Sequence, residues 1–459
     1  MKTRFIILYA LLLVCVMSGC KLGQKYVKPQ MSVPPTLEKG HDTDTFSIAD
    51  LAWWEIYNDS VLSRLITHTL DHNKDLRIAD ARIKELAARK RVELGNLFPT
   101  VNGQAYVQKE GLNYGGDRYK NDPEEGLKAS LSWELDLWGN LRWANDRSKA
   151  LLMESVENRR GLTLSIIAEV AQAYFELVAL DNELSIVRQT LDARKESVRL
   201  AKLRFEGGLT SETSYQQAKM ELARTATHIP ILERDIALKE NEISFLAGEF
   251  PSTIERNRQR KRITLPENLP VGLPSTLLER RPDVRAAEQS LIAANAAVGM
   301  AYTNRFPRLT LTATGGLESE EFSDFFKSPM HFLSASLLGS IFDFGRRQGA
   351  YRAQQAVYEQ ECYSYEKVVL NAFMEVRNAI VDYNKIQEIY ESMAELEQAS
   401  KTTMELAQLQ YINGVIGYID VLDAQRSYFD AQINLSNAIR NKELVIVQLY
   451  KALGGGWRQ

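Results

Sequence analysis

The stretch of sequence that decides the fold runs from Ile166 to Phe205 and reads IIAEVAQAYFELVALDNELSIVRQTLDARKESVRLAKLRF. Its apolar residues recur at alternating steps of three and four positions, with one break where Arg194 replaces an apolar residue. The apolar stripe consists of Ile166, Val170, Ala173, Leu177, Leu180, Leu184, Val187, Leu191, Val198, Ala201 and Phe205. A period of about 3.5 residues, kept over about forty residues, predicts a long helix that packs as in a left-handed coiled coil.

The same frame returns in the second half of the chain, with Glu397 as its break. There the stripe consists of Ala372, Val376, Ala379, Tyr383, Ile386, Tyr390, Met393, Ser400, Met404, Ala407 and Tyr411. If the first helix runs from about Trp143 to Phe205, it is ~90 Å long at a rise of about 1.5 Å per residue. A globular domain does not need a helix of that length.

An internal duplication organises the rest of the chain. The pair Phe98-Pro99 recurs as Phe306-Pro307, 208 residues later. Two further pairs have the same offset of 208, Asp75 with Asp283 and Arg77 with Arg285. Further along the chain the offset is 206, as in the pairs Gly139 with Gly345, Phe205 with Tyr411, Gly208 with Gly414 and Ala218 with Ala424. The period is far too long for a solenoid repeat, so we interpret it as one duplication of a large unit.

Each unit is predicted to hold two strands between a first helical segment and two long helical stretches. The alternating apolar or small residues are Val101, Gly103, Ala105 and Val107; Leu127, Ala129, Leu131, Trp133, Leu135 and Leu137; Leu309, Leu311 and Ala313; and Leu333, Ala335 and Leu337. This period of two gives each strand one apolar and one polar face. The pattern fits a soluble sandwich. Roughly ten-residue strands with a Gly- and Asp-rich loop from Gly111 to Gly126 equally fit a membrane barrel with a wet lumen.

Glycines mark the turns between the long helices, at Gly207 and Gly208 in the first unit and at Gly414 and Gly417 in the second. Glycine accepts the left-handed conformation that ends helices. A second helix then returns to about Ala247 or about Leu453, which gives two helical hairpins on four strands. Four strands cannot close a barrel in lipid because their edges would be unpaired, so closure needs further copies. Three copies give twelve strands and two give eight, and the duplication alone does not choose between them.

The first twenty residues have the pattern of an export signal. Lys2 and Arg4 precede an apolar run from Phe5 to Met17, which is short for a bilayer span but suits a secretory signal. Ser18-Gly19-Cys20 follows and resembles a bacterial lipobox, so we expect lipidation of Cys20. A plain signal peptide with an incidental cysteine is the alternative. No later stretch has eighteen consecutive apolar residues, so no transmembrane helix is predicted.

Charge and motifs exclude several classes of function. The net charge of -3 argues against nucleic acid as an electrostatic partner. The sequence has no Gly-x-Ser-x-Gly, HExxH or CxxC motif, and Gly454 to Gly456 lacks the Lys-Ser/Thr of a phosphate loop. His68 and His72 are four residues apart without an evident third ligand, so we expect no metal site there. We therefore expect no catalytic residue and no cofactor besides the covalent lipid on Cys20.

Four motifs carry a resemblance to a known family. They are Ser18-Gly19-Cys20, Arg280-Arg281-Pro282-Asp283-Val284, Tyr411 to Gly414 followed by Asp420 to Arg426, and Leu453 to Trp457. With the paired strand–helix repeats, they make the mature chain resemble the outer membrane factors of the TolC-like group, in the lipoprotein branch of tripartite efflux systems. The resemblance implies a mainly α fold with transmembrane β: a homotrimer with a twelve-stranded outer-membrane β-barrel, a twelve-helix periplasmic α-barrel and an equatorial collar. It also implies no catalytic activity, and as partners a periplasmic adaptor protein and an inner-membrane pump of the resistance-nodulation-division type.

The duplication and the resemblance together predict eight consecutive segments. They are a signal peptide (1–19); the lipid anchor, collar segment and first helix (20–98); a first β-hairpin (99–142); a first helical hairpin (143–248); a collar connection and helix (249–306); a second β-hairpin (307–345); a second helical hairpin (346–453); and a tail (454–459).

The resemblance assigns the turn from Gly414 to Gly417 to the periplasmic tip, where the tunnel narrows. Asp420 and Asp423 match an acidic ring there, Ile419 and Arg426 match residues that help to hold the entrance shut, and Tyr411 matches a tyrosine that ties adjacent helices. The residues by themselves support another interpretation, because acids near a helix N-terminus complement its dipole. The first repeat carries Ser214 and Gln217 at the two aspartate positions, so a trimer would hold three acidic pairs.

Two functions compete. One is a passive conduit that exports small molecules, such as drugs or metal ions, from the periplasm to the exterior. The other is a structural or adhesive coiled-coil lipoprotein of the cell surface. The polar faces of the strands and the duplicated barrel unit favour the conduit, because a rod needs neither.

Overall fold

The computed structural model describes residues 21–32, 53–57, 59–113, 119–257 and 279–455. The chain divides into two compact units. The first unit consists of Met1–Met31, Ala81–Glu157 and Arg285–Val368, and the second of Ser32–Asp80, Asn158–Val284 and Val369–Gln459. The predicted signal peptide, Cys20 and residues 456–459 of the predicted tail lie outside the described residues.

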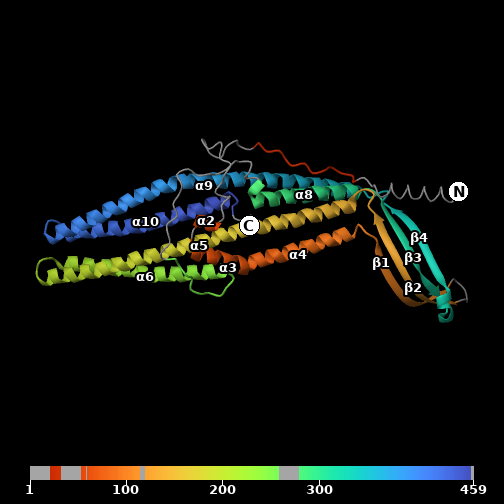
Figure 1. Cartoon of the computed structure of the whole chain (residues 1–459), viewed down its shortest axis with the longest axis horizontal. Coiled ribbons are helices and arrows are strands. Elements are labelled where there is room, and N and C mark those ends of the chain that lie inside the picture. The colour runs from red at the N-terminus through yellow and green to blue at the C-terminus, as the bar shows by residue number, and fades with distance from the viewer. Residues whose placement is uncertain (1–20, 33–52, 58, 114–118, 258–278, 456–459) are drawn as a thin grey trace. The chain divides into compact units, whose positions relative to one another are not determined.

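The helices of the two repeats match pair by pair in length (Figure 1). Helices α4 (Lys74–Gly95) and α8 (Pro282–Thr303) have 22 residues each, α5 (Asn140–Glu206) and α9 (Arg346–Ile412) have 67, and α6 (Glu212–Leu246) and α10 (Tyr418–Ala452) have 35. Two shorter helices, α2 (Trp53–Tyr57) and α3 (Ser60–His72), precede α4. At about 1.5 Å per residue, α5 and α9 are each ~100 Å long. The equal lengths agree with the duplication read from the sequence.

Four of these helices end in the same glycine turn. The glycines Gly208, Gly248, Gly414 and Gly454 follow α5, α6, α9 and α10 with φ angles of 72°, 74°, 72° and 74°. After each glycine, an amide donates to a carbonyl five residues back, as from Val415 to Gln410 at 2.9 Å. Glycine adopts this left-handed backbone without a steric penalty, because it has no Cβ. Of the other predicted turn glycines, Gly207 lies directly before Gly208, and Gly417 precedes α10 with an ordinary φ of -78°.

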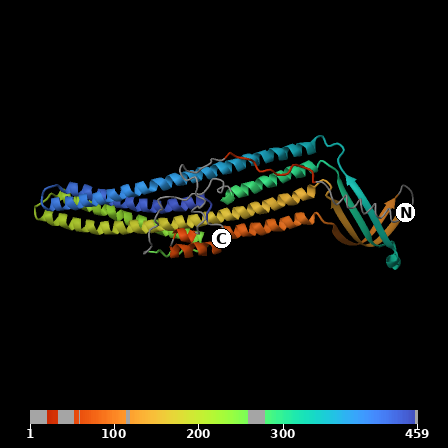
Figure 2. The same cartoon turned by 45° about the horizontal axis from the view of Figure 1, so that its top comes forward.

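The four strands form one antiparallel sheet, in the order β1 (Thr100–Asn113), β2 (Tyr119–Leu135), β3 (Arg308–Ser319) and β4 (Pro329–Leu338) (Figure 2). A short 3-10 helix, η2 (Phe322–Lys327), lies between β3 and β4. The predicted loop from Gly111 to Gly126 is wrong, since Gly111 pairs with Asn121 and Gly126 with Tyr106. Backbone groups form the ladder, so pairing continues where the side-chain alternation has already ended.

The apolar stripes of the long helices form the core of the second unit. On α5, Ile166, Val170 and Phe175 pack against Leu62 and Ile66 of α3. On α9, Val376, Ala379 and Tyr383 pack in one cluster with Val445 and Leu449 of α10. Figures 1 and 2 show α6 alongside α5 and α10 alongside α9. These two clusters bury part of each predicted stripe, whereas Phe205 at the end of the first stripe is exposed.

Helix α5 contains one eighteen-residue window that is apolar enough to cross a membrane by length and composition alone. The sequence pattern predicts no transmembrane helix here. However, 61% of the window is buried inside the structure. The core helix of a folded domain has the same composition, so packing explains the window.

Matched residues of the two repeats hold the ends of the returning helices. Asn73 donates its Nδ2 to the carbonyl of Leu246, at the end of α6, at 2.8 Å. Arg281, 208 residues further on, donates Nη1 to the final carbonyl of α10 at 2.9 Å. The buried guanidinium of Arg281 also pairs with the carboxylates of Asp283 and Glu375, at 2.7 and 2.6 Å. Asn73 and Arg281 therefore both bind a carbonyl at the end of a returning helix, although their side chains differ.

Candidate functional site

The sheet of the first unit has one apolar and one polar face. The register aligns Val101, Leu131, Ala313 and Leu333 in one row across the four strands, and Thr100, Ser132, Thr312 and Ser334 in the next row. Successive residues of a strand point to opposite faces, so these two rows lie on opposite sides. The apolar row is not covered, since Val101 is 66% exposed and Leu333 is 79% exposed. An exposed apolar face opposite a polar one is typical of a strand between lipid and a wet lumen.

Exposed aromatic side chains mark both ends of the strands. Phe322 and Phe326 of η2 follow β3 at one end, and both are largely exposed. At the other end, Phe98 precedes β1, and Phe342 and Phe344 follow β4, with their rings in edge contact. Membrane-spanning barrels carry aromatic residues in belts at both interfaces. The sheet thus has the distribution of residues that a bilayer requires.

The predicted gate residues lie at the start of α10 in the second unit. Asp420 accepts the amide of Gly417 at 3.0 Å, so its carboxylate caps the first turn of the helix. Asp423 is exposed, and its carboxylate accepts Nη1 of Arg426 at 3.2 Å. Ile419 is about half exposed. Both aspartates therefore have local partners while they remain open to solvent.

Arg426 also reaches a buried carboxylate that the sequence analysis missed. Its Nε donates to Oε1 of Glu221 on α6 at 3.0 Å. The other carboxylate oxygen of Glu221 accepts Nη1 of Arg194 on α5 at 2.9 Å, and Arg194 also contacts Thr225. The side chains of Arg194 and Glu221 are only 7% and 2% exposed. Glu221 therefore joins the two helical hairpins of one chain through a single carboxylate.

Electrostatics favour the ionised form of Glu221. Burial raises its pKa, but the hydrogen bond from Arg426 and the charges of Arg194 and Arg426 outweigh burial and hold the pKa below its usual value. Burial lowers the pKa of Arg194, and the charge of Glu221 opposes that effect. The break in the apolar stripe at Arg194 was the one sequence signal for this cluster, because its partner lies on another helix.

Tyr411 packs between the two helices of the second hairpin. Its ring lies 5.4 Å from that of Tyr418, and the guanidinium of Arg204 lies 4.6 Å from the centre of the Tyr411 ring. The hydroxyls of both tyrosines and Nε of Arg204 are buried and have no hydrogen-bond partner among the described residues. Burial raises the pKa of Tyr418 to about 12. Within this chain Tyr411 contacts α10 and α5 through its ring, and its role as a tie between adjacent helices stays a prediction.

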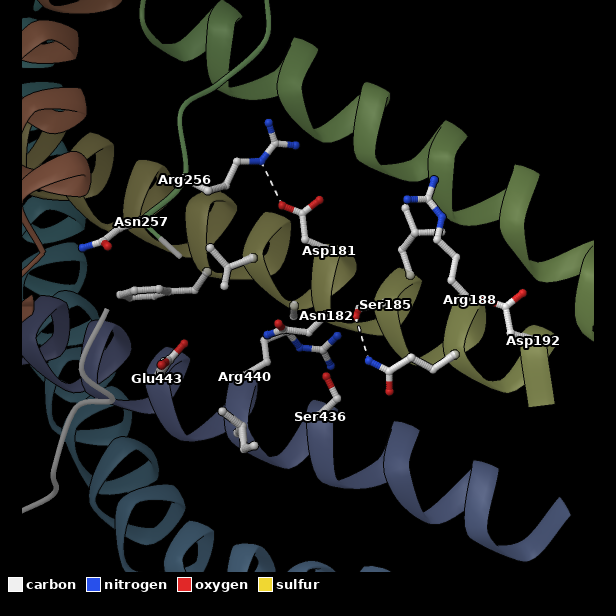
Figure 3. A pocket seen from close by; sticks show the side chains of 16 residues that line it. Asp181, Asn182, Ser185, Arg188, Asp192, Arg256, Asn257, Ser436, Arg440 and Glu443 are labelled. Atoms are coloured by element: carbon white, nitrogen blue, oxygen red, sulfur yellow. Dashed lines mark hydrogen bonds and ion pairs between the residues drawn. The ribbon is translucent and has the colours of Figure 1, made fainter. Parts of the chain in front are cut away.

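A groove of about 740 Å³ lies between α5 and α10 (Figure 3). Its residues on α10 run from Ser436 to Glu443, away from the start of the helix. Arg256 lines it and pairs with Asp181 at 3.0 Å, while Arg188 pairs with Glu233 at 2.9 Å. The lining has three arginines (Arg188, Arg256, Arg440) and three acids (Asp181, Asp192, Glu443). These charges balance in number, and none of the predicted gate residues lines the groove.

The remaining candidates are the histidine pair and the cysteines. The rings of His68 and His72 stack at 4.2 Å, and Nε2 of His68 lies 2.7 Å from Oε1 of Glu249. Within the described residues, no group of three or more His, Cys, Asp or Glu is placed to hold a metal ion. Cys362 is a free thiol in the described structure, and Cys20 lies outside it.

Comparisons with known proteins agree on one family. The family model described as "Outer membrane efflux protein" matches residues 65–249 and 273–455. The toluene efflux pump outer membrane protein TtgI of Pseudomonas putida is 31% identical, and the match covers 100% of this chain and 99% of TtgI. The probable outer membrane lipoprotein SilC of Salmonella typhimurium is 28% identical over 96% of this chain and 97% of SilC. The cation efflux system protein CusC of Escherichia coli O157:H7 is 27% identical, with the same shares of each chain covered.

Solved structures have the same fold. The outer-membrane channel OprN superposes with a TM-score of 0.90 at 29% identity, over 96% of this chain and 100% of OprN. The outer-membrane channel MtrE of Neisseria gonorrhoeae, in its open state, superposes with a TM-score of 0.83 at 28% identity, over 95% of this chain and 99% of MtrE.

Proposed function

Since this chain belongs to the outer membrane efflux protein family, we propose that three copies of it form a passive conduit for small molecules between periplasm and exterior. The protein is an outer-membrane channel component of an efflux system. The observation that carries the proposal is the register of the sheet, which separates an uncovered apolar face from a polar face. A passive channel needs this separation and no catalytic group.

Oligomer formation follows from the edges of the sheet. Among the residues that the structure describes, β1 and β4 are each paired on one side alone. In a bilayer, unpaired backbone amides and carbonyls cost several kcal/mol each, so the two edges must pair with other chains. Three copies give twelve strands, an intermediate size that leaves a lumen wider than that of a filled eight-stranded barrel. The choice of three follows the resemblance to the TolC-like channels.

We assign the periplasmic entrance to the start of α10. Asp420, Asp423 and Ile419 are exposed there, and Arg426 ties Asp423 to the buried Glu221. In a trimer, three copies of the aspartate pair place six carboxylates around one axis. Such a ring attracts cations and repels anions, as charged rings do in channels. The link from Arg426 to Glu221 would keep α10 against the first hairpin in the closed state.

A lipid anchor on Cys20 belongs to the same proposal. Small residues precede Cys20, and the relative SilC is described as a lipoprotein. Acyl chains contribute about 0.8 kcal/mol per buried methylene, so a lipidated Cys20 would bind the chain to the membrane independently of its strands.

As partners we propose a periplasmic adaptor protein and an inner-membrane pump of the resistance-nodulation-division type. The chain has no energy-converting motif of its own, so transport against a gradient requires another component. The relatives TtgI and CusC are described as parts of toluene and cation efflux systems. Such different cargoes on one fold fit a channel whose pump selects the substrate.

Reconstitution of the purified protein in a planar bilayer tests the proposal. We expect stepwise ionic currents. We also expect native mass spectrometry of the same sample to find three chains per particle. A structural or adhesive coiled-coil protein would give a stable sample without current. That result would reject the conduit.

A further inference from the structure

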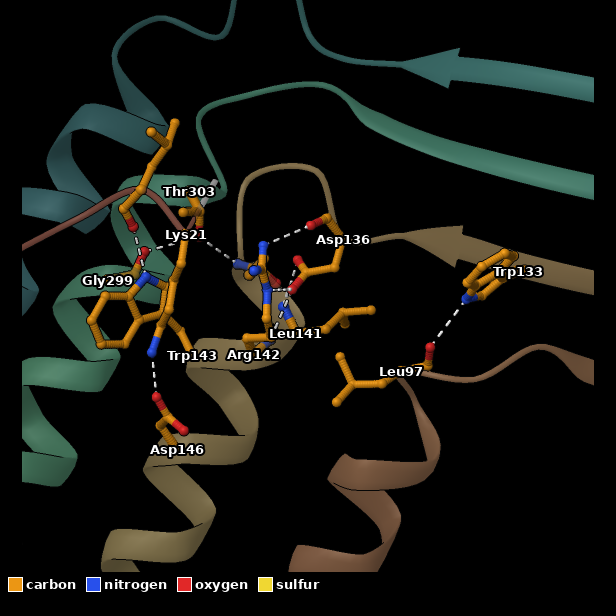
Figure 4. Close-up of polar contacts among 12 residues, drawn as sticks. Lys21, Leu97, Trp133, Asp136, Leu141, Arg142, Trp143, Asp146, Gly299 and Thr303 are labelled. Carbon is orange, nitrogen blue, oxygen red and sulfur yellow. Dashed lines mark hydrogen bonds and ion pairs between the residues drawn. The ribbon is translucent and has the colours of Figure 1, made fainter. Parts of the chain in front are cut away.

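Residues 21–28, here called the N-terminal segment, are fixed to the first unit where β2 passes into α5 (Figure 4). The amide of Leu22 donates to the carbonyl of Trp138 at 3.0 Å, and Nε1 of Trp143 donates to the carbonyl of Leu22 at 2.7 Å. Lys21 forms an ion pair with Asp146, and its ammonium lies 3.4 Å from the centre of a Trp143 ring. The two residues that follow Cys20 are therefore held in place, Lys21 by an ion pair and a cation–π contact and Leu22 by two backbone hydrogen bonds.

Glycines make room for this segment. A Cβ on Gly139 would lie 2.8 Å from Cα of Lys21, and a Cβ on Gly299 of α8 would lie 2.5 Å from the Trp143 ring. Both distances are too short for an ordinary residue, so neither position tolerates a side chain without movement. The second repeat has Gly349 at the position of Trp143, so it lacks the indole that receives the segment. Among the described residues, the second repeat therefore offers no equivalent of this docking place.

Beside the docked segment lies a groove of about 630 Å³ between the segment, α5 and α8. Its floor is mainly apolar and includes Trp143, Ala150, Met153, Ile292 and Ala296. Met153 is 37% exposed, although it is a large apolar residue.

The rim of this groove carries three lysines, Lys21, Lys25 and Lys149, and one acid, Asp146. Asp146 pairs with Lys21. Lys25 and Lys149 are exposed and form no ion pair with any residue of the described chain. The groove thus combines an apolar floor with two uncompensated positive charges.

We propose that this groove binds an anionic phospholipid, with the phosphate at Lys25 and Lys149 and the glycerol and upper acyl chain on the apolar floor. The inference rests on the proposed function, because the lipidated Cys20 and the strand ends would place the groove at the periplasmic surface of the outer membrane. Basic residues at such a surface attract anionic lipids. A neutral occupant, such as an acyl chain of Cys20 itself, would leave the two lysine charges uncompensated.

Location supports the same occupant. Aromatic residues gather at this end of the strands, where Trp138 stacks on Phe306 at 5.0 Å and donates Nε1 to the carbonyl of Pro307 at 2.8 Å. Tryptophan is enriched at the level of the lipid headgroups. The groove begins at Trp143, within two turns of Trp138, so a lipid in the adjoining leaflet reaches it without leaving the membrane.

Native mass spectrometry of the detergent-purified full-length oligomer tests the proposal. The protein is titrated with phosphatidylglycerol or phosphatidylcholine, and bound lipids per oligomer are counted. The variant Lys25→Gln with Lys149→Gln removes both rim charges, and the control variant Lys74→Gln with Lys84→Gln removes two exposed lysines of α4. We expect the first variant to bind phosphatidylglycerol roughly 30-fold more weakly, and the control to bind it like the unchanged protein.

Three results would overturn the proposal. They are equal retention of both lipids, unchanged phosphatidylglycerol binding in the Lys25 and Lys149 variant, and complete displacement of the lipid by millimolar inorganic phosphate, which would indicate a site for free phosphate. The same samples are measured in planar bilayers, and the mass of the mature N-terminus reports the lipid on Cys20. A silent channel would reject the proposed function, whereas a conducting channel without lipid preference would reject this inference alone.

Discussion

At the scale of single residues, Asp420 and Asp423 lie three positions apart on α10 but have different roles. Asp420 caps the helix through the amide of Gly417, whereas Asp423 is two-thirds exposed and holds Arg426. Asp420 is the third residue of α10 after its N-cap Gly417. A carboxylate in the first turn stabilises a helix by roughly 0.3–1 kcal/mol, and an exposed ion pair contributes about 1 kcal/mol or less. Both interactions contribute little to stability. Both carboxylates are exposed, so their charges can act on ions in the channel.

Replacing both aspartates should therefore change conduction more than stability. We expect Asp420→Ala with Asp423→Ala to raise the single-channel conductance in a planar bilayer and to weaken the preference for cations, while the helix start loses about 1–2 kcal/mol. The matched control is Ser214→Ala with Gln217→Ala, at the same places in the first repeat, and it should leave both quantities unchanged. Equal effects of the two variants would count against a gate role for the aspartates.

Glu221 makes the closed state sensitive to acid. Its pKa is held below the usual value, so its stabilising contribution is complete above pH about 4.5 and is lost as the pH falls through the lowered pKa. We expect conductance to rise as the pH falls through this lowered pKa, when the protonated carboxyl releases Arg426 and Arg194. Glu221→Gln leaves two arginines without this countercharge, costs about 3–5 kcal/mol and should give a high conductance that is flat over the same pH range. A Glu221→Gln channel that still opens on acidification would assign the acid response to other carboxylates.

At the scale of elements, the sequence predicted what is local. The heptad stripes located α5 and α9, and the glycines located their ends, because helix packing and left-handed turns leave direct signals in residue type. The contact of Arg194 with Glu221 was not predictable, since a carboxylate on α6 has no feature that marks its partner on α5. The length of β1 and β2 was also underestimated, because the backbone ladder does not depend on side-chain alternation. The segmentation into consecutive domains stays a prediction.

Replacing a glycine with alanine should lower stability at a helix-ending turn and raise it inside a helix. Gly414→Ala places a Cβ on a residue with φ of 72°, and we expect a loss of about 1–2 kcal/mol in the stability of the hairpin end. Gly161→Ala lies inside α5, where a Cβ would meet Pro282 at an ordinary 3.7 Å, and it should gain about 0.5–1 kcal/mol. Thermal unfolding followed by circular dichroism in detergent should move in opposite directions for the two variants. A shift in the same direction for both variants would count against backbone conformation as the cause of the two effects.

At the scale of the whole molecule, one chain is an incomplete structure. Each repeat supplies two strands and one helical hairpin, and the duplication doubles them without closing the sheet. The free edges of β1 and β4 and the uncovered apolar face have no partner within the described chain, so the membrane and other copies must provide both. The strand pattern of the sequence predicts that other copies are needed. It does not predict how many, because closure of a barrel depends on strand tilt and on the register between chains.

Leu333 and Ser334, adjacent residues at the middle of β4, test the assembled channel. Leu333 lies in the apolar row and Ser334 in the polar row of the sheet. An arginine on the lipid face at mid-depth costs about 2–4 kcal/mol per chain, so three copies of Leu333→Arg should prevent stable insertion and leave the protein out of the outer-membrane fraction. Ser334→Arg places the same charge in the lumen, where water solvates it, so this variant should insert normally and conduct with a lower preference for cations. Membrane fractionation followed by bilayer recording separates the two results, and equal insertion of both variants would mean that the apolar face does not contact lipid.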